Sequence, residues 1–361
     1  MKIKKRKKSK YIVRRVVAAF VGVVLIAGAA FAVSKIPAPQ TAPLEIDSAA
    51  YSQIVTEVSA PVTVSLAPKE AAEAVMAYVD PSKEIEVVVP DTFPIEATLQ
   101  SGYAILFDAT SGKVLFAKNA EDKAFPASTT KILTAAVLLD TLPEDYQFTV
   151  GSELSLVSEG SSLAGLSKGN VLSMPQMIDA LMLPSGNDAS YTAAVAAGRA
   201  IAEDENLSDS EAAKVFADRM NERLAAIGAR NSHFTVPDGF HDEDHYTTAA
   251  DMAKMAVHAA GYPLIMEAAV KEYETVTFIS GEQANWENSN KLIWDTSDCY
   301  YYYANGLKTG MTDEAGYCVV ATARRFDHDL VCVVLGAPAS DIRWNETMWL
   351  LDSGFAYIRE H

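Results

Sequence analysis

The spacing of hydrophobic residues changes near residue 100 and predicts most of the secondary structure from there to the C-terminus. Apolar runs of strand length lie at both ends of this region, bounded by turn-forming residues. The predicted strands are Tyr103–Asp108, Lys113–Ala117, Tyr317–Thr322 and Leu330–Leu335. A glycine-containing turn at Ala109–Gly112 joins the first pair into a hairpin, and a polar turn at Arg324–Asp329 joins the second pair.

Helical periodicity fills the segment between the two pairs of strands. Pro143, Gly228 and Gly261 each follow one of these helices, in positions where such residues commonly end a helix. The predicted helices are Thr129–Leu142, Met174–Met182, Ala189–Ala202, Glu211–Ile227, Thr248–Ala260 and, after the last strand, Asp341–Ile358. We expect a three-layer α+β fold (α/β/α), with an antiparallel sheet from both chain ends and a helical middle.

The first 33 residues have the pattern of a targeting segment. Nine Lys or Arg and no acid lie within residues 1–15, and Val16–Val33 is uncharged over eighteen residues. A helix of this length can cross a bilayer core of about 30 Å, with the basic flank in the cytoplasm. Ala30-Phe31-Ala32 resembles the cleavage site of a signal peptide, which is the alternative. The run is longer than the usual apolar region of a signal peptide, and no other membrane segment appears later in the sequence, so we expect an uncleaved membrane anchor.

Residues 34–99 are predicted to form an extended Pro-rich stalk outside the membrane. Proline occurs at positions 37, 39, 43, 61, 68, 81, 90 and 94, and glycine is absent. This composition favours a semi-stiff connection over a packed sheet, although Lys69–Val79 fits a short helix. A small additional domain is the alternative. The predicted divisions are therefore residues 1–33, 34–99 and a globular body at 100–361.

Charge and cysteine content exclude two classes of protein. The net charge is −17, and beyond residue 15 the chain has 21 bases against 47 acids. Such an acidic body repels phosphate backbones, so we expect no nucleic-acid partner. Three cysteines in 361 residues exclude a disulfide-stapled scaffold. Cys318 and Cys332 lie in apolar runs and are predicted to be buried, whereas Cys299 lies beside Tyr300–Tyr303, which either pack together or line a groove.

The strongest local signal for chemistry is the segment Phe125–Lys131, which reads FPASTTK. Ser128 and Lys131 are three residues apart at the start of a predicted buried helix, so the amine can reach the hydroxyl. A serine is a poor nucleophile without a neighbouring base, and burial lowers the pKa of a lysine towards the range of a base. A serine helix cap followed by a solvated lysine is the ordinary alternative.

Two further short motifs join this pair. Leu183–Asn187 places Ser185 and Asn187 in a loop between helices, and Gly306–Gly310 places Lys308 and Thr309 just before a predicted strand. The first supplies a hydroxyl and an amide; the second supplies a cation and a hydroxyl suited to a carboxylate. Taken singly, they are also compatible with a plain turn and a strand entry.

Together, in this order, the three motifs resemble those of the penicilloyl serine transferases, in which Ser-x-x-Lys, Ser-x-Asn and Lys-Thr-Gly line one cleft. Additional segments resemble the low-molecular-mass D-alanyl-D-alanine carboxypeptidases, namely Ser111–Phe116, Pro237–Gly239, His245–Met252 and Thr312–Tyr317. The resemblance covers about residues 100–358. It implies a β-lactamase/transpeptidase-like fold, peptidoglycan stem peptides as substrate, β-lactam antibiotics as covalent inhibitors, and no metal or other cofactor.

The resemblance also implies a covalent mechanism. Ser128 attacks the carbonyl between two terminal D-alanines and forms an acyl-enzyme, while Lys131 accepts its proton. Ser185 relays a proton to the departing D-alanine, with help from Lys308. Water then hydrolyses the acyl-enzyme.

The remaining motif residues are expected to hold the substrate. By the resemblance, Asn187 binds the peptide and orients Lys131, and Lys308 and Thr309 bind the terminal carboxylate. Gly310 lets the ligand lie along the strand. The backbone N–H groups of Ser128 and Met311 form the oxyanion hole.

Two features depart from the family pattern. Close relatives often have histidine after Lys-Thr-Gly, where this chain has Met311. Many also have a second, β-rich domain and a C-terminal anchor, whereas this chain ends at His361 after its last predicted helix. We therefore expect the N-terminal segment to hold the protein at the outer face of a bacterial membrane, or secretion if that segment is cleaved.

Two other signals are discounted. His241 and His245 are four residues apart, as in some metal sites, but Pro237 and Gly239 make a continuous helix there improbable. A polar surface turn explains them better. The segment that begins at Glu287 is similar to the one around the deacylating glutamate of class A β-lactamases. That pattern requires an asparagine four residues after the glutamate, and this position is Lys291 here.

The leading hypothesis is a D,D-carboxypeptidase. A D,D-endopeptidase or a β-lactamase uses the same chemistry and stays open as an alternative. A non-catalytic wall-binding protein is a further alternative, but the nucleophile and base it would have lost are both present.

Overall fold

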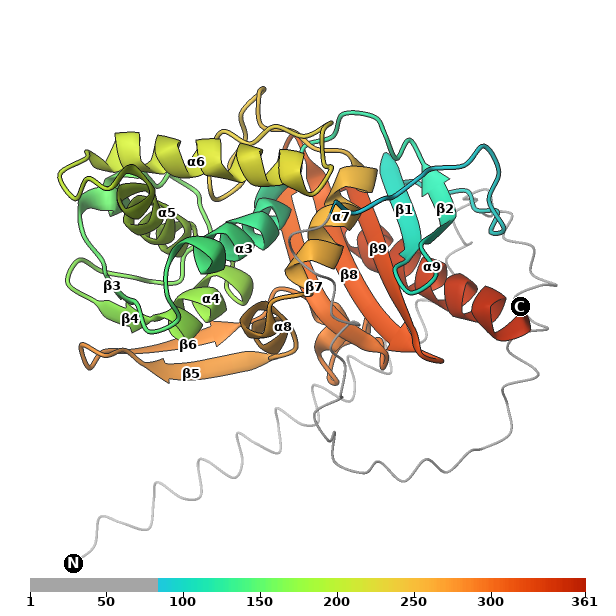
Figure 1. Ribbon diagram of the computed structural model, residues 1–361. Helices are drawn as coiled ribbons and strands as arrows, with labels where there is room; N and C mark the ends of the chain where they lie inside the picture. The colour runs from blue at the N-terminus through green and yellow to red at the C-terminus, as the bar shows by residue number, and fades with distance from the viewer. Residues whose placement is uncertain (1–83) are drawn as a thin grey trace, which may run out of the picture. The chain divides into compact units, whose positions relative to one another are not determined.

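The computed structural model describes residues 84–361, and its centre is a sheet assembled from the two ends of this region (Figure 1). Five antiparallel strands follow the order β2-β1-β9-β8-β7 in this part of the chain. Their bounds are β1 Tyr103–Asp108, β2 Lys113–Lys118, β7 Ala304–Thr312, β8 Gly316–Arg325 and β9 His328–Ala337. The pairing of β1 with β9, in which Ile105 faces Val333, joins the two ends. The predicted sheet topology is confirmed.

Each face of the sheet is covered by helices. Neighbouring residues of a strand point to opposite faces, so Val333 packs in one core cluster and Val334 in the other. Helix α9 (Ser340–Glu360) covers the second face with Phe355, and helix α7 (Ala249–Ala259) covers the first with Met252. Strands buried on both faces need near-continuous apolar runs, which is the pattern of β8 and β9. The three-layer prediction is confirmed.

The helical middle lies beside the edge strand β7 (Figure 1). It contains the 3-10 helix η1 (Ala127–Thr130), α3 (Lys131–Thr141), α4 (Met174–Met182), α5 (Asn187–Ala202), α6 (Asp209–Ala226) and α8 (Pro263–Ala269). Helix α6 begins at Asp209 rather than at Glu211, because Ser208 and Glu211 form a capping box. Gly198 lets α5 and α6 approach closely, since a Cβ there would lie 1.9 Å from the carbonyl oxygen of Ala212.

Some short elements were not predicted. Besides helix α8, they include the hairpins β3 (Gln147–Thr149) with β4 (Val171–Ser173) and β5 (Tyr273–Thr277) with β6 (Gln283–Glu287), and the 3-10 helices η2 (Ser152–Leu156) and η3 (Lys291–Ile293). Their polar, short segments carry little periodicity. The prediction that Gly306–Gly310 precedes a strand was wrong, because these residues lie inside β7. Glycine lowers strand propensity, yet pairing with β8 holds them extended.

Residues 84–99 are part of the globular body rather than of a free stalk. The backbone N–H of Ile85 donates to Ile227, and that of Ile95 donates to Leu115 on β2. Ile85, Ile95 and Leu99 are buried in the core clusters. The boundary predicted after Leu99 is therefore too late by at least these residues. The predicted anchor at 1–33, the stalk at 34–83 and the helix Lys69–Val79 lie outside the described residues.

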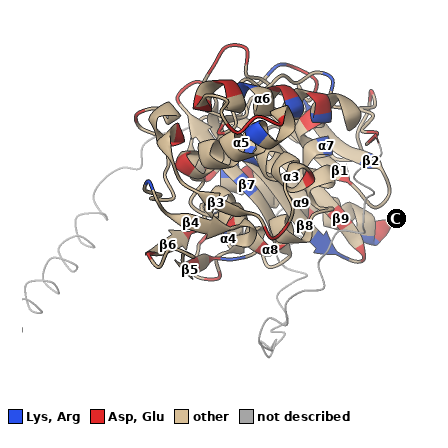
Figure 2. Cartoon of the chain, turned by 60° about the vertical axis from the view of Figure 1, so that its left-hand side comes forward, with Lys and Arg blue, Asp and Glu red and all other residues tan. Residues whose placement is uncertain are grey.

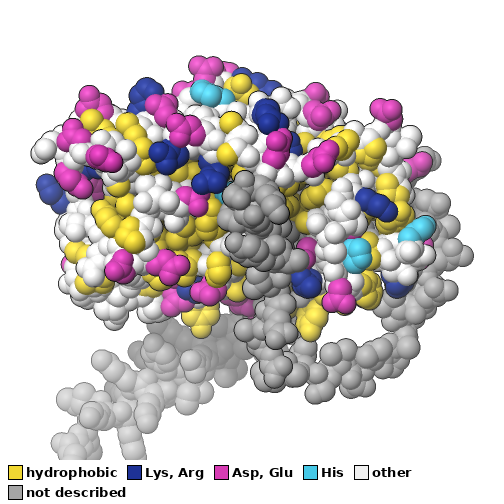
Figure 3. Space-filling view, in the orientation of Figure 1, with side chains coloured by type: hydrophobic (Ala, Val, Ile, Leu, Met, Phe, Trp, Pro, Cys, Tyr) yellow, Lys and Arg dark blue, Asp and Glu magenta, His cyan; other side chains and the backbone are white. Residues whose placement is uncertain are grey.

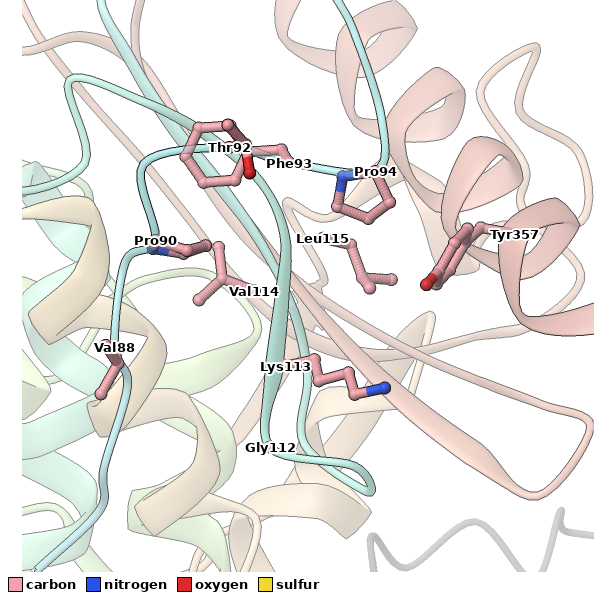
Figure 4. A pocket seen from close by; sticks show the side chains of 10 residues that line it. All are labelled: Val88, Pro90, Thr92, Phe93, Pro94, Gly112, Lys113, Val114, Leu115 and Tyr357. Atoms are coloured by element: carbon pink, nitrogen blue, oxygen red, sulfur yellow. The ribbon is translucent and has the colours of Figure 1, made fainter. Parts of the chain in front are cut away.

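A cavity of about 530 Å³ lies between this segment and the edge strand β2 (Figure 4). Phe93, Leu115 and Tyr357 are among its lining residues. Strand β2 is at the opposite edge of the sheet from β7, so the cavity is separate from the three sequence motifs.

Acidic and basic residues are spread over many elements of the described chain (Figure 2). On the face seen in Figure 3, Asp and Glu side chains lie interspersed with Lys and Arg. Within residues 84–361, no helix has the length and apolar character needed to cross a membrane.

Candidate active site

The three sequence motifs, which are far apart along the chain, meet beside strand β7. Lys131 Nζ lies 2.9 Å from Ser128 Oγ and 2.7 Å from Asn187 Oδ1, and it donates to both. Strand β7 runs directly past the serine, because a Cβ placed on Gly310 would lie 2.8 Å from the backbone nitrogen of Ser128. The site therefore lies where η1, the N-terminus of α5 and β7 converge.

Ser128 lies in the 3-10 turn η1, and α3 begins only at Lys131. Its side chain is partly exposed, whereas Ala127, Thr129 and Thr130 on either side are buried. Ala127 has a φ of +47°, in the left-handed region that non-glycine residues rarely adopt. A tight turn with buried flanks thus presents one hydroxyl to the open side of the site.

Lys131 is fully buried and has no carboxylate among its hydrogen-bond partners in the described region. Its Nζ also donates to the backbone carbonyl of Asp238 at 2.7 Å. Burial lowers the pKa of Lys131 to about 8, against the opposing charges of Asp238 and Asp188. About a tenth of the amine is therefore neutral at pH 7, with a lone pair available for the Ser128 proton.

Ser185 has an unusual backbone and an unusual side chain. Its φ is +62°, and its buried hydroxyl has no hydrogen-bond partner among the described residues. A buried hydroxyl without a partner is uncommon and usually has a functional reason. No hydrogen bond within the described chain joins it to Ser128, Lys131 or Lys308, so the relay predicted from the sequence stays a prediction.

Asn187 and Asp188 connect the site to the loop of residues 161–166. Asn187 Nδ2 donates to Ser161 Oγ at 2.8 Å. Both oxygens of the buried Asp188 carboxylate accept backbone N–H groups, from Ala164 and Leu166, each at 2.8 Å. Asp188 was not singled out from the sequence, although an acid at the first turn of a helix is a recognisable signal. The two residues fasten this loop next to Lys131.

Strand β7 contributes Lys308 and Thr309, both buried. Lys308 Nζ donates only to the carbonyl oxygen of Thr309, at 3.1 Å, among the described residues. Burial, followed by the charges of Lys131 and Arg343, lowers the pKa of Lys308 well below its ordinary value. The Thr309 hydroxyl lies 2.6 Å from Ser289 Oγ. A bound anion would reverse the shift, because an opposite charge favours the ammonium form.

Arg343 on α9 is a further cation that sequence reasoning missed. Its Nη1 donates to the carbonyl oxygens of Gly310 at 3.4 Å and Cys318 at 3.1 Å, from beneath β7. A lone arginine in a helix carries no local signal, so only the packing of α9 on the sheet brings it here. Lys131, Lys308 and Arg343 form no ion pair in the described structure, which leaves positive charge available to an anionic ligand.

Met311 follows the motif residues at the end of the buried part of β7. Its side chain is 55 % exposed, whereas Lys308, Thr309 and Gly310 are buried. A methionine side chain carries no N–H or O–H, so only the backbone N–H can be the oxyanion donor expected from the sequence.

The discounted residues have definite places. Asp242, Glu243 and Asp244 form an exposed turn as predicted, but His245 is buried, so the prediction of a surface turn was wrong for this residue. Cys318 and Cys332 are buried and free, as predicted. Cys299 is half-buried, and Tyr301 beside it packs in the core.

A serine paired with a buried lysine, with Ser-x-Asn and Lys-Thr-Gly beside it on this α/β/α scaffold, defines the class of serine penicillin-binding proteins. Residues 91–339 match the model of the D-alanyl-D-alanine carboxypeptidase family of serine peptidases, and the chain belongs to this family.

Curated relatives and solved structures agree with this membership. The chain is 30 % identical over 267 residues to D-alanyl-D-alanine carboxypeptidase DacF of Bacillus subtilis, covering 72 % of this chain and 63 % of the relative. It is 32 % identical over 283 residues to DacC of Escherichia coli, covering 74 % and 66 %. The chain thus spans slightly less than two thirds of these relatives.

The crystal structure of the Streptomyces K15 DD-transpeptidase superposes with a TM-score of 0.66 at 28 % identity. The match covers 73 % of this chain and 99 % of that one. Penicillin-binding protein D2 from Listeria monocytogenes, with a TM-score of 0.58 at 24 % identity, shares the fold.

Asp188→Asn should loosen the 161–166 loop. An amide has one acceptor oxygen, and its NH₂ group would face a backbone N–H, so one charge-assisted hydrogen bond is lost. We expect about 1.5–3 kcal/mol less stability in urea unfolding and faster amide exchange at Ala164 and Leu166. Asp218→Asn, which breaks an exposed ion pair with Lys214, is the control and should change neither. Unchanged exchange in Asp188→Asn would contradict the clamp.

Proposed function

We propose that the protein is a serine D,D-carboxypeptidase that removes the terminal D-alanine from peptidoglycan pentapeptides through an acyl-enzyme on Ser128. The observation that carries the proposal is the 2.9 Å contact between Ser128 Oγ and the buried Lys131 Nζ. Family membership and the named activity of the relatives support the substrate class. Lys308 and Arg343, which form no ion pair among the described residues, support an anionic peptide terminus as ligand.

In the proposed first step, neutral Lys131 takes the proton of Ser128 as the oxygen attacks the carbonyl between the two D-alanines. The negative charge that develops on the carbonyl oxygen is accepted by the backbone N–H groups of Ser128 and Met311. The C–N bond then breaks, and the D-alanine nitrogen receives the proton that Lys131 took from Ser128, relayed by the Ser185 hydroxyl, which has no hydrogen-bond partner among the described residues. The product is an ester on Ser128 and free D-alanine, and water then hydrolyses the ester.

Substrate binding uses the remaining polar groups. Lys308 and the Thr309 hydroxyl bind the terminal carboxylate, and Arg343 adds positive charge from beneath the strand. Asn187 uses its oxygen on Lys131 and one N–H on Ser161, so its second N–H is free for the peptide. Gly310 lets β7 lie directly beside Ser128, since a Cβ there would come within 2.8 Å of the Ser128 backbone nitrogen.

The acceptor of the acyl group distinguishes the alternatives. The K15 relative is named a DD-transpeptidase, in which an amine takes the place of water. Efficient turnover of β-lactams requires a deacylating base, and Glu287 is exposed at the end of β6. We therefore propose that β-lactam antibiotics acylate Ser128 and stay bound as covalent inhibitors.

Ser128→Ala should lower the rate of D-alanine release from diacetyl-Lys-D-Ala-D-Ala by about a thousandfold or more, because no covalent route remains. Release is measured by an enzyme-coupled D-alanine assay, with the exposed Ser280→Ala as control. Equal release by Ser128→Ala and the parent would refute the assignment. Cleavage of crosslinked dimers or fast penicillin turnover by the parent would instead favour an endopeptidase or a β-lactamase.

The rate of acylation should rise with pH and level off above about pH 8. Only neutral Lys131 is a base, and at pH 7 about a tenth of a group with a pKa near 8 is neutral. Asp238→Asn should move the midpoint to lower pH, since the Asp238 charge raises the pKa of Lys131. The measurement is stopped-flow labelling by a fluorescent penicillin between pH 6 and 10. A flat profile would contradict the role of Lys131.

We also propose that residues 1–33 anchor the catalytic domain at the outer face of a bacterial cytoplasmic membrane. The basic residues 1–15 and the uncharged Val16–Val33 support this orientation. The full chain should stay with membranes after an alkaline carbonate wash and keep Met1 as its first residue. A soluble chain beginning at Val33 would show that the segment is a cleaved signal peptide.

A further inference from the structure

A buried histidine lies directly behind the Ser128 turn and is not used by the mechanism above. His245 is 2 % exposed and stacks on Phe234, with ring centroids 4.6 Å apart and planes inclined by 14°. Its Nε2 lies 2.8 Å from Thr130 Oγ1, and its Nδ1 lies 3.0 Å from the backbone nitrogen of Thr235. The ring thus bridges the 235–245 loop and the turn that carries the nucleophile.

The direction of these hydrogen bonds follows from the chemistry of the groups. The N–H of Thr235 can only donate, so His245 Nδ1 is the acceptor. Burial lowers the pKa of His245 to about 3, so the ring is neutral and its single proton lies on Nε2. That proton is donated to Thr130 Oγ1, which in turn donates to the carbonyl oxygen of Ala127 at 2.8 Å. The three groups form a chain with one orientation.

The Ala127 carbonyl, which is the last acceptor in this series of hydrogen bonds, matters because of peptide geometry. The carbonyl of Ala127 and the N–H of Ser128 belong to the same planar peptide unit, so fixing the direction of one fixes the direction of the other. The N–H side of this unit faces β7, since a Cβ on Gly310 would come within 2.8 Å of the Ser128 nitrogen. This N–H is an oxyanion donor in the proposed reaction.

The peptide unit needs such support. Ala127 has a φ of +47°, a conformation that is unfavourable for a non-glycine residue. Gly239 packs on its other side, because a Cβ there would lie 1.9 Å from the Ala127 carbonyl oxygen. A backbone bridge between Ala124 and Thr247, with N···O distances of 2.8 and 2.9 Å, fixes the start of the turn.

We propose that His245 is a positioning residue for acyl transfer, which acts through Thr130 to hold the Ala127–Ser128 peptide with its N–H aimed at the developing oxyanion. The inference rests on the proposed function, because it assigns a task within that reaction. It predicts that loss of the hydrogen bonds from His245 through Thr130 to Ala127 lowers the rate of the chemical step. Substrate binding is retained, because oxyanion contacts strengthen in the transition state.

Thr130→Val tests this inference, because valine has the shape of threonine without the hydroxyl. We expect the acylation rate constant for a fluorescent penicillin and kcat for diacetyl-Lys-D-Ala-D-Ala to fall roughly ten- to a hundredfold, with KM nearly unchanged. Thr130→Ser retains the hydroxyl and should restore most of the rate. His245→Leu alone should lower the acylation rate relative to the parent. In the double variant with Thr130→Val it should cause little further loss, because the two residues act in series.

Thr347→Val is the matched control. Thr347 is also fully buried and donates to a backbone carbonyl, that of Arg343 at 2.7 Å, but it lies on α9 across the sheet. We expect Thr347→Val and Thr130→Val both to lower the midpoint of thermal unfolding. Only Thr130→Val should lower kcat.

The outcomes separate the two levels of the proposal. If penicillin labels the parent and Thr130→Val is acylated at the same rate, the positioning role alone is overturned. The same holds if Thr347→Val loses as much of the acylation rate as Thr130→Val does. Additive effects of His245→Leu and Thr130→Val overturn it as well. A folded parent that neither reacts with penicillin nor releases D-alanine overturns the proposed function and this inference with it.

Discussion

The burial of the Lys131 amine is the constraint on which the rest of the site depends. An ammonium group removed from water is unfavourable unless polar atoms surround it, so Lys131 requires acceptors that the chain must deliver from elsewhere. Ser128, Asn187 and the Asp238 carbonyl meet this need at 2.7–2.9 Å. Placing these acceptors requires α3, α5 and the loop before α7 to pack together. The same desolvation that makes the site demanding to build also makes the lysine a usable base.

Close backbone approach is the second requirement, and it explains why glycine stands at particular positions. Gly310 and Gly239 lie on two sides of the Ser128 turn, where a Cβ would collide with backbone atoms. Ala127 and Ser185 adopt positive φ values within the same region. Such conformations persist only where the surroundings over-determine them. Here the surroundings are a rigid edge strand on one side and hydrogen-bonded loops on the other, so a flexible hydroxyl and its neighbouring N–H can be held in fixed directions.

Three basic side chains collect in the site, and none of them forms an ion pair within residues 84–361. Lys308 comes from strand β7 of the sheet, and Arg343 comes from helix α9, which packs on the sheet. Lys131 comes from the helical middle. Elsewhere in the described chain, acidic and basic residues are spread over many elements (Figure 2). A chain that is acidic overall therefore still offers a small cationic site to an anionic ligand, because burial and geometry, rather than net charge, decide what a cleft attracts.

The sequence by itself determined the elements whose signals are local. Apolar runs of strand length predicted β1, β8 and β9, helical periodicity predicted the principal helices, and the three-residue spacing of Ser128 and Lys131 already placed them in reach. Only the tertiary structure decided what surrounds that pair. Asn187 is 56 residues from Lys131, Asp238 is 107 residues away, and His245 is 115 residues from Thr130. Arg343 and Asp188 likewise carry no periodic signal that reveals their partners. Such contacts depend on how whole elements pack, because hydrophobic burial sets the arrangement of helices on the sheet before any polar pair can meet.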